Sequence, residues 1–288
     1  MKPEWLTIKP ASTEKYAEIK KTISSLNLHT VCTEAQCPNI TECWSGGTAT
    51  FMVLGELCTR GCRFCSVSKS ASGAAVDPLE PYKLGQAIKQ WGLSYVVITS
   101  VCRDDMPDQG SAHFARCVEE IKKANPGILV EVLIPDFQGN SDFLKTVVDS
   151  KPDVVGNNIE TVERLSPQVR DRRAAYRQSL DVLANVKKID LTRYTKSAMM
   201  LGIGETDDEV FQAMQDLRAA NVDFLAMGQY LKPKGHHLEL KEYVTPEKFE
   251  FFKEKAIEMG FLYVASGPFV RSSYKAGEHF ISAIVNRK

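Results

Sequence analysis

Short apolar runs alternate with longer amphipathic stretches along most of the chain. Residues 95–101 (YVVITSV) and 128–134 (ILVEVLI) are rich in β-branched and apolar side chains, as in strands that are buried on both faces. The stretches between such runs have apolar positions at helical spacing, and glycine or asparagine follows several of them, where helix C-caps belong. This alternation is typical of consecutive βα units and a parallel sheet.

The pattern predicts a definite order of elements. Main strands are predicted at 48–54, 95–101, 128–134, 153–159, 195–203 and 222–229, with a further short strand at 261–265. Helices are predicted at 14–26, 81–91, 111–124, 141–149, 174–187, 207–220 and 246–259. Six main βα units are fewer than the eight of a closed barrel. We therefore predict an α/β fold, namely an open, partial TIM-like (βα)6 barrel with N- and C-terminal extensions.

No linker or repeat divides the chain, so we expect one compact unit with three segments. These are an N-terminal arm with a cysteine-rich loop (1–47), the partial barrel (48–265) and a C-terminal extension (266–288). The 288 residues carry 36 Lys and Arg against 36 Asp and Glu, which gives no broad basic field for nucleic acid. No apolar run reaches the roughly 18 residues of a membrane span. The polar first residues lack a secretory core, so a cytoplasmic location is expected.

Six of the eight cysteines fall between residues 30 and 66, in two triplets. The first triplet has the spacing C-x4-C-x5-C and the second has the spacing C-x3-C-x2-C. Their members are Cys32, Cys37 and Cys43, then Cys58, Cys62 and Cys65. In a reducing compartment, thiols this close together indicate a metal or cluster rather than disulfides.

The second triplet lies in the loop after the first predicted strand, at the barrel end where chemistry is expected. A structural zinc site is the simpler alternative, but zinc takes four ligands and no fourth Cys or His lies nearby. A [4Fe–4S] cluster held by three thiolates leaves one iron open, and that iron can chelate a small molecule. The triplet therefore favours a cluster.

The sequence C58-T-R-G-C-R-F-C65, with Phe64 before the last cysteine, resembles the signature of the radical S-adenosylmethionine superfamily. The resemblance implies that Cys58, Cys62 and Cys65 hold a [4Fe–4S] cluster that reduces S-adenosylmethionine. Homolysis then gives methionine and a 5′-deoxyadenosyl radical, which abstracts hydrogen from unactivated C–H bonds. The cofactor carries this chemistry, while the barrel positions it and excludes water.

The first triplet, C32-T-E-A-Q-C-P-N-I-T-E-C43, resembles the auxiliary-cluster motif of the lipoyl synthase family. Further stretches agree over about residues 30–276, among them DPLEP from Asp77, VEVLIPDF from Val130 and ASGPFVRSSY from Ala265. The resemblance implies a second [4Fe–4S] cluster held by the first triplet and by a serine of the R-S-S-Y motif. We assign that ligand to Ser273, with Ser272 as the second choice. The simpler alternative is that both serines cap a C-terminal helix.

Polar residues at predicted strand ends are candidates for contacts with S-adenosylmethionine or substrate. These are Arg103, Asn158, Glu160 and Lys196, each of which could instead form a structural ion pair. Cys102 and Asn157 depart from the aspartate and histidine that the family usually places there. Cys117, on a predicted helix, is expected to be a buried apolar side chain.

The family resemblance implies radical insertion of two sulfur atoms, at C6 and C8 of an octanoyl chain bound to a lysine. The auxiliary cluster would be the sacrificial sulfur donor, and two molecules of S-adenosylmethionine would be used. Expected partners are an octanoylated lipoyl carrier domain (a dehydrogenase E2 subunit or glycine cleavage H protein), a ferredoxin- or flavodoxin-type reductant and an iron–sulfur cluster carrier. The alternatives are another sulfur-inserting enzyme of the biotin synthase type and a non-enzymatic iron–sulfur carrier.

Overall fold

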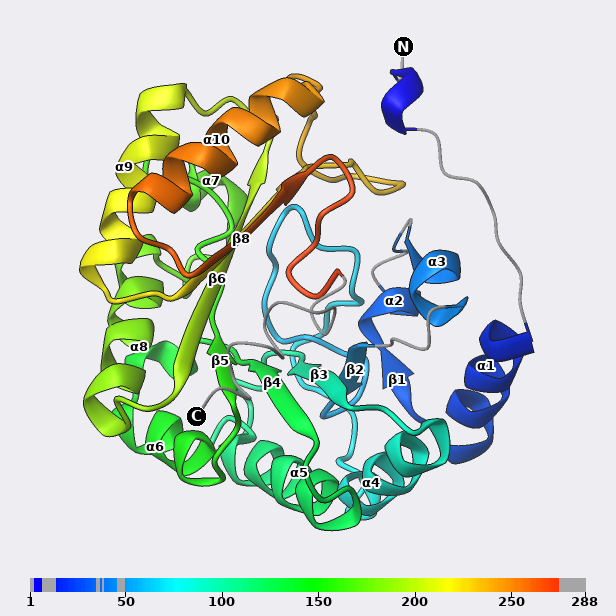
Figure 1. Cartoon of the computed structure of the whole chain (residues 1–288). Coiled ribbons are helices and arrows are strands. Elements are labelled where there is room, and N and C mark those ends of the chain that lie inside the picture. Colours follow the sequence, from blue (N-terminus) through cyan, green and yellow to red (C-terminus); the bar gives the residue numbers. More distant parts are fainter. Residues whose placement is uncertain (1–2, 7–13, 35–36, 38, 46–49, 275–288) are drawn as a thin grey trace.

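A single eight-stranded sheet organises the part of the chain that the computed structural model describes, namely residues 3–6, 14–34, 37, 39–45 and 50–274. The strands follow the order β1-β2-β3-β4-β5-β6-β7-β8. β1 pairs antiparallel with β2, and all later neighbours pair in parallel. β1 and β8 stand at the two ends of this order, so the sheet is an open barrel, with most helices on its outer face (Figure 1).

The strands are β1 His29–Thr30, β2 Thr50–Val53, β3 Tyr95–Ser100, β4 Leu129–Leu133, β5 Val154–Gly156, β6 Tyr194–Leu201, β7 Phe224–Gln229 and β8 Tyr263–Gly267. The longer helices are α1 Glu14–Leu26, α4 Glu80–Trp91, α5 Ser111–Ala124, α6 Ser141–Asp149, α8 Tyr176–Ile189, α9 Asp207–Ala219 and α10 Pro246–Glu258. Short helical segments are η1 Glu4–Leu6, α2 Val31–Glu34, α3 Ile40–Ser45, η2 Phe137–Gly139 and α7 Ser166–Val169.

The predicted (βα)6 arrangement is confirmed, with β8 as one more parallel strand. α1, α5 and α6 have the predicted bounds. β5 is shorter than predicted, because the chain leaves the ladder after Gly156 and turns into the carboxyl end of the barrel. The antiparallel strand β1 was not predicted, since a two-residue strand leaves no alternating pattern. The first two residues of the predicted strand 48–54 lie outside the described residues, as does most of the C-terminal extension.

Local sequence explains where several helices begin and end. α9 starts at a capping box, in which the Thr206 hydroxyl accepts from the Glu209 amide and the Glu209 carboxylate accepts from the Thr206 amide. α4 ends at Gly92, whose φ of 62° is a left-handed conformation that glycine adopts at little cost. Caps of this kind fix the lengths of the outer helices and so the positions of the loops between them.

The amino end of the barrel is filled by side chains. Tyr95, Leu129 and Phe224 belong to one buried apolar cluster there. Next to it, the Lys196 ammonium donates to the Glu131 carboxylate at 2.8 Å, and the Tyr95 hydroxyl donates to the same carboxylate at 2.5 Å. Because this end is closed by packing and a buried ion pair, the space for ligands lies at the carboxyl ends of the strands.

Candidate cofactor and substrate site

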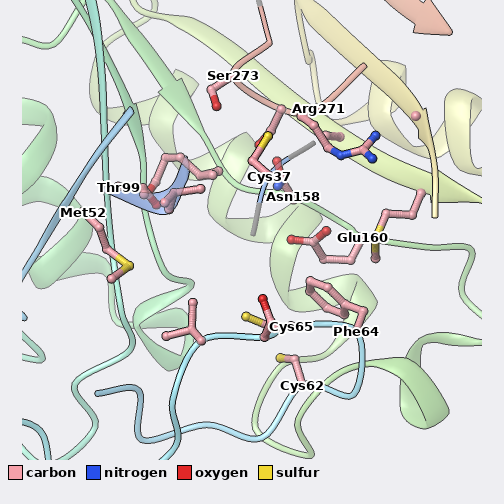
Figure 2. A pocket seen from close by; sticks show the side chains of 18 of the residues that line it. Cys37, Met52, Cys62, Phe64, Cys65, Thr99, Asn158, Glu160, Arg271 and Ser273 are labelled. Atoms are coloured by element: carbon pink, nitrogen blue, oxygen red, sulfur yellow. The ribbon is translucent and has the colours of Figure 1, made fainter. Parts of the chain in front are cut away.

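A cavity of about 570 Å³ opens at the carboxyl ends of the strands. Its walls include Ser100 at the end of β3, Val101 after it, Ile134 after β4 and Gly228 in β7. All six cysteines of the two triplets and Ser273 line it: Cys32, Cys37, Cys43, Cys58, Cys62, Cys65 and Ser273. In Figure 2, Cys37 and Ser273 lie on one side of this space and Cys62 and Cys65 on the other. The cavity therefore brings together the two cysteine triplets and the R-S-S-Y motif.

The loop that carries the second triplet is held in shape by its backbone. The Cys58 amide donates to the Ser68 carbonyl at 2.8 Å, and the Ser70 amide donates to the Cys58 carbonyl at 3.0 Å. Two further amides point at sulfur: that of Arg60 at Cys58 Sγ (3.4 Å) and that of Asp171 at Cys62 Sγ (3.3 Å). Amide hydrogen bonds to sulfur favour the thiolate and tune an iron–sulfur cluster, so this loop has the form of a ligand loop.

The three thiols of this loop have different proton affinities. A hydrogen bond with the Cys102 thiol lowers the pKa of Cys58 to about 6, although burial opposes this shift. Burial raises the pKa of Cys62 and raises the pKa of Cys65 to about 11. A metal centre requires all three as thiolates, so cluster binding must displace protons from the second and third cysteines.

A buried charge network holds the same loop against the barrel, and sequence reasoning missed it. Arg60, between the first two cysteines, is only 4% exposed. Its guanidinium donates to both oxygens of Asp104 at 2.8 Å and to Asp136 Oδ1 at 2.7 Å. Burial opposes the charge, but these two carboxylates outweigh that cost and raise the pKa of Arg60. The network fixes Cys58 and Cys62 relative to the ends of β3 and β4.

The first triplet lies on α2, α3 and the loop between them. The Cys37 amide donates to the Cys32 carbonyl at 3.0 Å, and the Cys43 amide donates to the Asn39 carbonyl at 2.9 Å. Burial raises the pKa of both Cys32 and Cys37. If these thiols are the predicted ligands, they too would have to lose their protons on binding a metal.

The C-terminal segment reaches this triplet from the far end of the sequence. The Asn39 side-chain amide donates to the Phe269 carbonyl at 2.6 Å, and the Tyr274 hydroxyl donates to the Glu42 carboxylate at 3.1 Å. Both contacts tie the R-S-S-Y segment to α3 and its preceding turn. They place Ser273 in the cavity beside the first triplet, which suits its predicted role as a ligand.

Gly228 in β7 allows the C-terminal segment to pack closely against that strand. A Cβ at position 228 would lie 2.0 Å from the Val270 carbonyl oxygen, which no side chain could tolerate. Arg271 follows and also lines the cavity, and burial lowers the pKa of its guanidinium. The glycine is thus a requirement of packing between β7 and the C-terminal segment.

Two of the four predicted contact residues line the cavity, and two do not. Asn158 and Glu160 do, and burial raises the pKa of the Glu160 carboxyl group against the attraction of Arg170. Glu160 has a φ of 67°, a left-handed conformation that aims its side chain into the cavity (Figure 2). Lys196 instead pairs with Glu131 beneath the cavity, nearer the amino end of its strand.

Arg103 is also turned away from the cavity. It is buried, pairs with Asp105 at 2.9 Å and donates to the Leu54 carbonyl at 3.2 Å. The structure therefore favours structural ion pairs for Arg103 and Lys196, because their cationic groups are already neutralised by neighbouring carboxylates. The two departures from the family pattern, Cys102 and Asn157, both line the cavity. Cys117 is fully buried, as predicted.

Buried polar atoms without partners test whether the cavity suits a polar ligand. Among the described residues, Asp136 Oδ2, Asn157 Oδ1 and Arg170 Nε have no hydrogen-bond partner, and all three residues line the cavity. An unsatisfied buried polar atom costs free energy unless a ligand or water satisfies it. S-adenosylmethionine carries ammonium, carboxylate, hydroxyl and adenine groups, so donors and acceptors of both kinds fit this wall.

Comparison with known proteins agrees with this geometry. The family model "Radical SAM superfamily" matches residues 52–217, and the model for the N-terminal domain of lipoyl synthase matches residues 1–37. A lipoyl synthase of Phaeodactylum tricornutum is 53% identical over 305 residues, covering 100% of this chain and 76% of that protein. The chain belongs to the lipoyl synthase family. A lipoyl synthase of Culex quinquefasciatus is 55% identical, covering 99% of this chain and 77% of its own length.

Distant structures share the fold of this lipoyl synthase family member. A methylornithine synthase superposes with a TM-score of 0.52 at 10% identity, covering 96% of this chain and 88% of its own. The FeFe-hydrogenase maturase HydG of Carboxydothermus hydrogenoformans gives 0.57 at 11% identity, covering 96% and 71%. Membership of the radical S-adenosylmethionine superfamily implies one [4Fe–4S] cluster and S-adenosylmethionine. The three thiols of the second triplet and the unsatisfied polar atoms nearby fit both.

The comparisons say less about the cellular compartment of this protein than about its family. No helix in the described part of the chain is long and apolar enough to cross a membrane. The relatives carry names with different compartments, mitochondrial for the Culex protein and chloroplastic for a 54% identical protein of Ricinus communis. The cytoplasmic location therefore stays a prediction.

Proposed function

We propose that this chain is a lipoyl synthase, which inserts two sulfur atoms at C6 and C8 of an octanoyl chain held in amide linkage to a lysine of a carrier protein. The observation that carries the proposal is that both cysteine triplets and the R-S-S-Y segment open into one cavity. A non-enzymatic cluster carrier needs no such enclosed space. A biotin synthase type of enzyme lacks the first triplet.

On one side of the cavity, Cys58, Cys62 and Cys65 hold a [4Fe–4S] cluster through their thiolates. With S-adenosylmethionine bound, this centre supplies a 5′-deoxyadenosyl radical that can take hydrogen from an unactivated C–H bond. Asn158 and Glu160 orient the cosubstrate through hydrogen bonds to its polar groups. Arg60 keeps the cysteine loop in place through its ion pairs with Asp104 and Asp136.

On the other side, Cys32, Cys37, Cys43 and Ser273 hold a second [4Fe–4S] cluster, which is a substrate because it gives up its sulfide. A serine alkoxide is more basic than a thiolate, so protonation releases it more readily. Ser272 is the alternative ligand, since it lines the same cavity. A ligand that is easily lost suits a cluster that must be opened.

Between the two sides, the walls suit an acyl chain. Met52, Leu133, Ala198 and Ala226 face the cavity with apolar groups of different sizes. They would exclude water from a reactive radical and offer apolar contacts to a linear chain. The proposal requires partners outside the chain: an octanoylated carrier domain of the E2 or glycine cleavage H protein type, a ferredoxin- or flavodoxin-type reductant, and an iron–sulfur carrier that rebuilds the consumed cluster.

The test is anaerobic incubation of the reconstituted protein with S-adenosylmethionine, reductant and an octanoyl-lysine peptide. We expect about eight irons per chain, and mass spectrometry should show a peptide product that has gained two sulfurs. In Cys37→Ala, formation of 5′-deoxyadenosine should persist while the lipoyl product disappears. Normal lipoyl formation by Cys37→Ala would refute the role of the first triplet, and tightly bound zinc in place of iron would refute the whole proposal.

A further inference from the structure

The exposed charged side chains that line the cavity are all basic among the residues that the structure describes. Three of the described residues that line the cavity are both charged and exposed, and all three are lysines: Lys69, Lys232 and Lys234. The carboxylates that line it, Asp136 and Glu160, are turned inward. We call these three lysines the lysine rim.

The rim is only weakly neutralised. Lys232 pairs with Glu239 at 2.5 Å. Lys69 and Lys234 have no carboxylate partner among the residues that the structure describes. The whole chain has equal numbers of basic and acidic residues, 36 of each, so this local excess is not a consequence of overall composition.

Two separate loops supply the rim, and backbone hydrogen bonds join them. Lys69 follows the second cysteine triplet and forms a β-bridge with Cys58. Lys232 and Lys234 lie in the loop after β7. This loop is attached to the cysteine loop because the Leu238 amide donates to the Arg63 carbonyl at 3.0 Å. The lysines are therefore displayed around one opening rather than scattered over the surface.

We propose that the lysine rim is the docking surface for an acidic face of the carrier protein that presents the octanoyl-lysine. This inference rests on the proposed function and adds the chemistry of the partner's surface. A chain tethered to a lysine of a folded domain can enter the cavity only if that domain sits over the mouth. Complementary charge at such a rim raises the association rate and fixes orientation. Three lysines are also far fewer than the 6–10 phosphate contacts typical of a nucleic-acid site.

The experiment compares two substrates in a charge-reversed variant, Lys69→Glu with Lys234→Glu. One substrate is an octanoylated carrier domain whose surface is acidic around the modified lysine, and the other is a neutral octanoyl-lysine peptide. We expect KM for the carrier to rise about tenfold with kcat retained, while KM for the peptide changes less than twofold. The salt dependence of KM for the carrier should also weaken in the variant.

The matched control is Lys20→Glu with Lys89→Glu, which reverses two exposed lysines on α1 and α4 that do not line the cavity. It should behave as wild type with both substrates. The variant Lys69→Arg with Lys234→Arg keeps both positive charges, so its KM for the carrier should stay close to that of wild type. Iron content and circular dichroism of each variant show whether it folds and loads its clusters.

Equal changes in KM for carrier and peptide, or no change for either, would overturn the docking proposal. The same holds if the reversal abolishes binding of a short RNA but leaves KM for the carrier unaltered. Failure of the wild-type protein to convert either substrate would instead refute the proposed function, so the two failures are distinguishable.

Discussion

The two cysteine triplets line the same cavity but are held in different ways. The second lies in a barrel loop, where the amides of Arg60 and Asp171 point at sulfur and the Arg60 side chain is locked between two buried carboxylates. The first lies outside the parallel barrel, on α2, α3 and the residues between them, and hydrogen bonds tie it to a segment more than two hundred residues away. This difference is what we expect if, as proposed, the second triplet holds a centre that is kept through each turnover (the retained centre) and the first triplet holds one that is consumed and rebuilt (the consumed centre).

Removal of one ligand from the retained centre should have the largest effect. Cys65→Ala should abolish both 5′-deoxyadenosine and lipoyl formation, because two thiolates cannot hold the cluster in a form that binds S-adenosylmethionine. Iron analysis and chromatography of the nucleoside measure the loss. Cys117→Ala removes a cysteine that lines neither side of the cavity, and it should keep its full iron content. Adenosyl cleavage in Cys65→Ala at the wild-type rate would contradict the assignment.

Displacing the C-terminal segment should affect only the consumed centre. Gly228→Ala would place a methyl group 2.0 Å from the Val270 carbonyl oxygen and force the R-S-S-Y segment outward. A shift of about 1 Å in a catalytic group can cost about a hundredfold in rate, so lipoyl formation should fall by roughly that factor while 5′-deoxyadenosine formation continues.

The matched control for this change is Gly267→Ala, on the strand that pairs with Gly228. Its Cβ would meet Val270 Cγ2 at 3.6 Å, an ordinary contact. It should retain lipoyl formation close to that of wild type. Similar losses in both variants would mean that the closeness of β7 to the C-terminal segment is unimportant.

The ion pairs of Arg60 with Asp104 and Asp136 should contribute strongly to the stability of the fold around the second triplet. Arg60→Ala leaves Asp104 and Asp136 buried with lost partners, and breaking a buried pair in this way costs about 3–5 kcal/mol. Chemical denaturation measures the free energy of unfolding. Arg164→Ala removes an arginine that is 54% exposed in its pair with Glu209, and it should lower the free energy of unfolding far less than Arg60→Ala does, because solvent screens an exposed pair. Comparable losses for the two variants would contradict a special role for Arg60.

The smallest effect concerns pH and lies far from either triplet. Hydrogen bonds from Arg164 and the Thr206 cap lower the pKa of Glu209 from 4.5 to about 2. A depressed carboxyl pKa stabilises the fold fully above pH 4.5, and this contribution is lost as the pH falls towards 2. In Glu209→Gln the loss in free energy of unfolding should be below about 1 kcal/mol at pH 7, because Arg164 is 54% exposed and solvent screens the pair, and this loss should vanish near pH 2. A loss of stability in Glu209→Gln that grows as the pH falls would contradict this prediction.

The barrel could be predicted well because the patterns that indicate its strands and helices lie within short stretches of neighbouring residues. Runs such as 128–134 have one simple cause, burial on both faces, and the cysteine spacings are visible in the chain itself. What the sequence did not show depends on distant contacts. Arg60 looks like any loop arginine until Asp104 and Asp136 fold around it. Lys196 stands on a predicted strand, but only the folded structure reveals that its ammonium pairs with Glu131 below the cavity.

The sequence also did not show that Asn158 lines the cavity while Arg103 does not. Both follow strands, and the direction in which each side chain leaves its strand decides whether it reaches the cavity. Asn158 lines the cavity. Arg103 instead pairs with the Asp105 carboxylate and donates to the carbonyl of Leu54, directly after β2. Polar residues at strand ends therefore identified the correct edge of the barrel, but not which of them point into it.

The most direct test of the account follows the sulfur atoms. The protein would be reconstituted with isotopically heavy sulfide, freed of excess sulfide and allowed a single turnover with the octanoyl-lysine peptide. We expect a lipoyl product with two heavy sulfurs, together with loss of the first-triplet cluster and retention of the second. A product that carries sulfur from solution, or one formed in a variant without Cys32, Cys37 and Cys43, would contradict it.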